Sequence, residues 1–230
     1  MITQHPNIYI SPNCRPAEFM APFREVLEEI NMELNRVASA FYSYEVEGDK
    51  TESVDNLFRF IERTWVGVFN NALNRHSSGI TTLQEFSVWG NDKAAGRCDL
   101  LFRYHDNNDT HDFITEAKTW EFFNNWGHPS SPEFYFSILS QAYKYYAAEV
   151  DYYKAYKSNI WLLAFVVEWV RDKPMLEAAN AIMNEWNHNT DNETDFITLY
   201  KGKSSGAFIY GKFMSVEEFK KTYLVKVKKK

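Results

Sequence analysis

The chain has 230 residues, 45% hydrophobic and 24% charged, so it is long and apolar enough to bury one sizeable core. Its formal net charge of −6 argues against a nucleic-acid-binding surface of the usual basic kind. Its two cysteines lie far apart and form no CxxC pair, which argues against a disulfide scaffold and a thiolate zinc site.

The charge is unevenly distributed along the chain. Six of the 25 basic side chains lie in residues 220–230, which hold no acid. Residues 1–219 therefore hold 19 basic and 31 acidic side chains. Such a tail either attracts a phosphate backbone or is a solvated terminus. No basic-then-apolar segment opens the chain, and the longest apolar run is too short to span a bilayer. We therefore expect a soluble, cytoplasmic protein that makes no membrane contact.

The first third of the chain is expected to be mainly helical. Residues 1–16 contain three prolines and predict an extended arm. Apolar side chains then recur every three or four residues over 18–41, which predicts an amphipathic helix. A polar loop over 43–53 and a second helix over 53–76 are expected to follow.

The period then changes to that of strands, and three are expected in succession, over 80–89, 97–104 and 110–118. An irregular aromatic loop over 119–132 precedes a long helix, a buried strand, a helix, a hairpin and a short helix that Ser215 caps. The ranges expected for the first four of these are 133–156, 159–169, 173–187 and 196–213. No linker or repeat divides the chain, so residues 1–230 are expected to form a single domain.

The second and third strands are expected to form a hairpin. Two asparagines at 107–108 suit its turn, because asparagine tolerates the positive φ that such turns need. A turn centred there places Arg103 opposite Asp112 and Asp99 opposite Glu116. Side chains that face each other in this way have Cβ atoms about 4.5–5.5 Å apart.

Two facing carboxylates destabilise a strand pair unless something neutralises them. A divalent cation would do so, because Mg²⁺ (or Mn²⁺) takes carboxylate oxygens and is commonly completed by a substrate phosphate. Lys118 lies two residues beyond Glu116 and therefore on the same face. Its ammonium could position a metal-activated water or stabilise charge that develops on the phosphate. This chemistry indicates a nuclease.

These residues resemble the PD-(D/E)xK nuclease superfamily of restriction endonucleases and recombination nucleases. The resemblance rests on Asp99, on Glu116-Ala117-Lys118, and on the order helix, three strands, helix, strand. It implies an α/β fold, in which a mixed central sheet carries an αβββαβ restriction-endonuclease-like core over 53–169. Residues 1–52 would add an arm and a helix, and residues 170–230 a β-hairpin plus a helix. One departure is that Cys98, not proline, precedes the aspartate.

The resemblance also implies roles for individual residues. Asp99 and Glu116 would bind the metal, with Glu62 as a third ligand on the preceding helix. Lys118 would act in catalysis, and Gln141 would support the site, because many members carry a glutamine on the later helix with a tyrosine four residues on. The implied activity is metal-dependent hydrolysis of phosphodiester bonds, expected in DNA, in defence, repair, recombination or mobile-element processing.

Several alternatives stay open on the sequence alone. A catalytically inactive protein of the same fold would bind nucleic acid or a partner protein, and either form could be a homodimer. Asp99 could pair with Arg97 or Lys118, and Glu116 with Lys118 as a surface ion pair.

The supporting residues also have structural interpretations. Glu62 could face solvent, with Glu52 and Glu85 as rivals for the third carboxylate, and Gln141 could be a surface amide. The aromatic side chains around the loop are candidates for substrate or partner contact. They are Trp120, Phe122, Phe123 and Trp126.

Overall fold

The fold is known from a computed structural model. It describes residues 7–42, 62–75, 79–90, 93–106, 109–121, 132–170, 172–186, 193–201 and 206–224. The predicted loop over 43–53, the first part of the second helix, the 107–108 turn and the lysines beyond residue 224 lie outside these ranges. So do Glu52, Phe122, Phe123 and Trp126.

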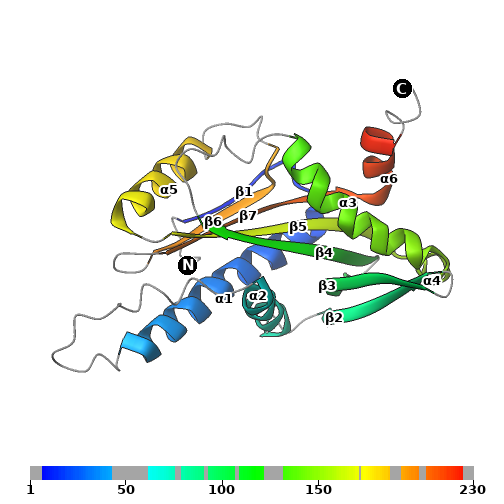
Figure 1. The fold of residues 1–230 in the computed structure, drawn as a ribbon, viewed down its shortest axis with the longest axis horizontal. Helices are drawn as coiled ribbons and strands as arrows, with labels where there is room; N and C mark the ends of the chain where they lie inside the picture. Colours follow the sequence, from blue (N-terminus) through cyan, green and yellow to red (C-terminus); the bar gives the residue numbers. More distant parts are fainter. Residues whose placement is uncertain are drawn as a thin grey trace.

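The chain forms a mixed α/β fold around one seven-stranded sheet of order β1-β6-β7-β5-β4-β3-β2 (Figure 1). Strands β4 and β5 are parallel, and every other neighbouring pair is antiparallel. The strands are β1 (Ile8–Ile10), β2 (Ile80–Gly90), β3 (Lys93–His105), β4 (Thr110–Glu121), β5 (Asn159–Val170), β6 (Phe196–Lys201) and β7 (Gly206–Ser215).

Helices cover both faces of this sheet (Figure 1). Helices α1 (Ala17–Tyr42) and α2 (Glu62–Arg75) lie on one face, where their apolar side chains join those of β3 to β7 in one core. Helices α3 (Pro132–Ala148), α4 (Val150–Tyr156), α5 (Lys173–Trp186) and α6 (Val216–Phe219) contribute to the core of the opposite face. None of the helices in the described part of the chain combines the length and apolar character needed to cross a bilayer.

Within the described residues the predicted helices and strands are present, although β3 begins at Lys93, four residues before its predicted start. Three other places differ. Ile8–Ile10, expected in an extended arm, forms a short edge strand that pairs with β6. The strand is too short to show the alternation of polar and apolar residues that predicts a strand. The long helix predicted over 133–156 is interrupted at Glu149, where the backbone leaves the helical region (φ −116°, ψ 25°). Residues 119–121, expected to begin a loop, extend β4, because β5 continues alongside and pairs with them.

The predicted register of the β3–β4 hairpin is confirmed. Arg103 pairs with Asp112 and Leu101 with Ile114, as a turn centred on 107–108 requires. The predicted cap of the last short helix is also confirmed: Ser215 caps α6 by accepting a hydrogen bond from the backbone N–H of Glu218. The hairpin register fixes which carboxylates approach one another.

Candidate functional site

The regular pairing of β3 and β4 runs from His105 and Thr110 to Leu100 and Thr115. One position further on, a side chain takes the place of a backbone carbonyl as hydrogen-bond acceptor. Oδ2 of Asp99 accepts a hydrogen bond from the N–H of Ala117 at 2.8 Å. The two strands therefore separate at the position where the sequence predicts Asp99 to face Glu116.

The neighbouring strand β2 is irregular at the same level. Glu85 lies opposite Asp99, between the pairs Gln84–Leu100 and Phe86–Cys98, and its φ of 48° is in the left-handed region. The alternation of buried side chains also shifts here, because Cys98 belongs to the core under α3 whereas Leu100 belongs to the core under α1 and α2. Non-glycine residues with positive φ are uncommon and concentrate at functional sites.

Glu116 is a buried carboxylate, with only 1% of its surface exposed. Its Oε1 lies 2.6 Å from Nζ of Lys118, which also donates to the carbonyl of Ala117 at 2.8 Å. A buried carboxylate needs such compensation, since isolation from water strongly disfavours its charge. The ion pair that was the structural alternative for Glu116 and Lys118 therefore exists, but Glu116 is buried and not at the surface as that alternative had it.

Burial raises the pKa of Asp99. The Ala117 N–H, the Lys118 charge and a hydrogen-bonding interaction with the Glu116 carboxyl oppose this rise. The Glu116 carboxyl therefore acts on the pKa of Asp99 where the two strands separate.

Helix α3 brings two further polar groups to this place. The side-chain amide of Gln141 donates to the hydroxyl of Tyr145 at 3.1 Å. Burial raises the pKa of Tyr145, and the charges of Glu116 and Asp99 raise it further. Gly96 permits this approach, because a Cβ there would lie 3.0 Å from Cε1 of Tyr145 and its φ is 139°. Gln141 is therefore tied to the site through Tyr145.

The third carboxylate is not identified among the described side chains. Glu62 is the first residue of α2, but its side chain lies outside the described part, as does Glu52. Within the described ranges, no group of three or more His, Cys, Asp or Glu side chains is arranged to hold a metal ion.

Glu85, the remaining rival, is engaged elsewhere. Its Oε1 lies 2.9 Å from Nε of Arg63 on α2, and its Oε2 lies 3.1 Å from Nη1 of Arg97 on β3. Arg97 was a candidate partner of Asp99 and pairs with Glu85 instead. Sequence reasoning did not single out Arg63, because nothing local distinguishes it from other polar residues of an amphipathic helix.

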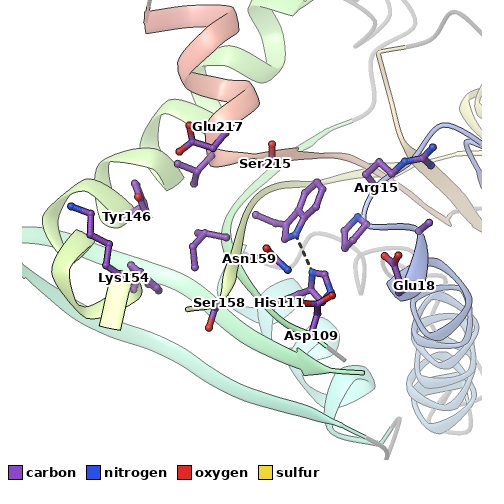
Figure 2. Close-up of a pocket in the computed structure, with 16 residues that line it drawn as sticks. Arg15, Glu18, Asp109, His111, Tyr146, Lys154, Ser158, Asn159, Ser215 and Glu217 are labelled. Carbon is purple, nitrogen blue, oxygen red and sulfur yellow. Dashed lines mark hydrogen bonds between the residues drawn. The ribbon is translucent and has the colours of Figure 1, made fainter. Parts of the chain in front are cut away.

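A cavity of about 680 Å³ lies elsewhere, where the first turn of α1 meets the beginnings of β4 and β5 (Figure 2). Within it, the Trp161 indole N–H donates to Nδ1 of His111 at 3.3 Å, the contact drawn as a dashed line. Residues of β4 rise about 3.3 Å each, so Glu116 lies roughly 17 Å along the strand from His111. None of the predicted site residues lines this cavity.

Comparison with known proteins adds no relative. No protein-family model, curated protein or solved structure matches the chain.

Proposed function

We propose that the chain is a metal-dependent nuclease that hydrolyses phosphodiester bonds of DNA at the site formed by Asp99, Glu116 and Lys118. The observation that carries the proposal is the separation of β3 from β4. It leaves two interacting carboxyls on adjacent strands, with the Lys118 ammonium 2.6 Å from one of them. An uncompensated acidic pair would be costly at this position, whereas a pair that holds a cation is functional.

The residues present fit a divalent cation with few protein ligands. Mg²⁺ keeps several waters and is commonly bound through one or two carboxylates plus substrate phosphate, so Asp99 and Glu116 would suffice as its described ligands. When bound, Mg²⁺ (or Mn²⁺) would polarise the phosphate and lower the pKa of a coordinated water. Lys118 would orient the attacking water or stabilise negative charge on the phosphate. Gln141 would support the site through the Tyr145 hydroxyl.

The chain order of the elements is consistent with the proposal. The succession is α2, β2, β3, β4, α3, α4 and β5, with β5 parallel to β4. If α3 and α4 are taken as one interrupted helix, this order resembles the αβββαβ core of restriction-endonuclease-like proteins. Helix α1 and the β6–β7 hairpin with α6 would then be the additions outside that core. Fold alone does not imply function, so the proposal rests on the site.

The test is cleavage of supercoiled plasmid and of single-stranded DNA with Mg²⁺ or Mn²⁺, comparing the wild-type protein with Lys118→Ala. The proposal expects metal-dependent cleavage that Lys118→Ala removes. Cleavage that survives the substitution unchanged would contradict the site. Binding of DNA without cleavage under any of these conditions would favour an inactive binding protein of the same fold.

A further inference from the structure

Two arginines and one glutamate form a bridge beside the candidate site. Arg63 and Arg97 each contact a different oxygen of Glu85, at 2.9 and 3.1 Å. The three side chains come from α2, β3 and β2, so this bridge joins the helix to the two strands at one edge of the sheet.

The backbone places this bridge next to Asp99. Glu85 lies opposite Asp99 in the β2–β3 register, and its charge acts on the Asp99 carboxyl. Glu85 also has a φ of 48°, a conformation that costs free energy for any residue with a side chain. The distortion of β2 therefore occurs at the residue that holds the two arginines.

Both guanidinium groups remain accessible. The side chains of Arg63 and Arg97 are 63% and 53% exposed, whereas that of Glu85 is 25% exposed. A guanidinium carries five N–H donors in a planar fork that matches phosphate oxygens, and Arg97 contacts Glu85 through Nη1. The contacts with Glu85 thus orient the arginines, and each arginine side chain stays more than half exposed.

We propose that Arg63 and Arg97, oriented by Glu85, bind the phosphodiester backbone of the substrate beside Asp99. This inference rests on the proposed function and identifies where a chain of negative net charge contacts nucleic acid. Arg63 and Arg97 together form a small basic strip. The strip would be sufficient to position a nucleic-acid backbone on the protein, but it is too small for strong binding by itself.

The charges around the strip predict a dependence on the metal. Arg63, Arg97 and Lys118 carry three positive charges, and Glu85, Asp99 and Glu116 carry three negative charges when ionised. A divalent cation would give this group a positive balance. Nucleic acid should therefore bind weakly without a divalent ion and more tightly with one.

The chain contains a matched control at the other end of α2. Glu33 bridges Arg36 and Arg75 there, at 2.6 and 2.7 Å, and Arg36 is 69% exposed. Arg63 and Arg75 are twelve residues apart, about 18 Å along the helix at a rise of 1.5 Å per residue. Arg36→Ala therefore removes a comparable exposed, paired arginine away from Asp99.

The experiment measures binding of fluorescently labelled duplex and single-stranded DNA by anisotropy over a series of salt concentrations. Ca²⁺ replaces Mg²⁺ to limit cleavage, and melting curves confirm that each variant folds. The variants are Arg97→Ala, Arg63→Ala, the double variant and Arg36→Ala. Removing one arginine that binds a phosphate should make the slope of log K against log salt shallower by about 1, and Arg36→Ala should match wild type.

The outcomes separate the two proposals. Metal-dependent cleavage that Lys118→Ala removes, together with unchanged salt slopes in the Arg63 and Arg97 variants, would overturn the phosphate strip alone. Equal loss of binding in Arg97→Ala and Arg36→Ala would overturn it too, because the effect would then be one of general charge. A wild-type protein that neither binds nor cleaves nucleic acid would overturn the proposed function, and the strip with it.

Discussion

Two buried carboxylates on β4, Asp112 and Glu116, lie four residues apart on the same strand, and each is 1% exposed. Asp112 is bound through both oxygens by Arg103 of the paired strand, at 2.6 and 2.8 Å. Glu116 is bound through Oε1 by Lys118 of its own strand, with the carboxyl of Asp99 on the strand opposite. Asp112 thus faces a cation across the sheet, whereas Glu116 faces another acid.

The difference lies in where each carboxylate sits in the hairpin. Asp112 is inside the regular ladder, where a bidentate arginine satisfies it and adds rigidity. Glu116 lies just beyond the last regular pair, where the strands have separated. The structural ion pair and the proposed cation site would therefore be built from similar residues on one strand, and the partner across the sheet would distinguish them.

The largest expected effect is on the rate of DNA cleavage, and it should separate the two basic partners, Lys118 and Arg103. Lys118→Ala should lower kcat for DNA cleavage about a hundredfold to a thousandfold, the usual cost of one stabilising group at the reacting centre. Arg103→Ala should leave the kcat of the folded fraction near that of wild type, because Arg103 binds Asp112 inside the regular ladder and not at the opened strands. Initial rates with matched folded protein concentrations test this contrast, which equal losses in both variants would refute.

The reverse contrast should appear in stability. Asp112→Ala leaves the partly buried Arg103 without its bidentate partner, and should lower the free energy of unfolding by about 3 kcal/mol. Urea unfolding followed by circular dichroism measures it. Glu116→Gln keeps the shape and removes the charge, so its destabilisation should be smaller. A larger loss for Glu116→Gln than for Asp112→Ala would mean that Glu116 is chiefly structural.

A smaller loss is expected at Gly96, which lets Tyr145 reach the opened strands. Gly96→Ala places a Cβ 3.0 Å from Cε1 of Tyr145, at a φ of 139°. The substitution should destabilise the fold by about 1–3 kcal/mol, through backbone strain and displacement of Tyr145. Thermal melting of Gly96→Ala and of Gly67→Ala provides the measurement and its control, since a Cβ at Gly67 meets nothing within 4 Å.

The smallest effect is expected on the pH dependence of stability, through Glu168, a carboxyl whose hydrogen-bond partner is neutral. On β5, Glu168 accepts a hydrogen bond from the Tyr210 hydroxyl at 2.6 Å, and burial raises the pKa of Glu168 from 4.5 to about 7. Folding therefore favours the protonated form, and its stabilising contribution is complete below pH 4.5 and lost as pH rises through about 7. Glu168→Gln should flatten the dependence of melting temperature on pH over this window. An unchanged pH profile would show that Glu168 is not the group responsible.

The sequence could predict the helices and most strands because their apolar periodicity is local. It could also predict the pairing register of β3 and β4, since the position of the turn and the strand period determine it. It could not predict the left-handed backbone at Glu85, the bridge to Arg63 or the interruption at Glu149. These features depend on how distant elements pack, and no neighbouring residue encodes them. The edge strand β1 was not predicted for the same reason, because its pairing with β6 is a long-range contact.

Titration calorimetry with Mn²⁺ tests the central claim most directly, because it requires no knowledge of the substrate. Wild type, Glu116→Gln and Asp112→Asn are compared at one pH, each shown to be folded. The account predicts that wild type and Asp112→Asn bind the ion and that Glu116→Gln loses the binding. Equal binding by all three proteins, or no binding by wild type, would contradict a metal site at Asp99 and Glu116.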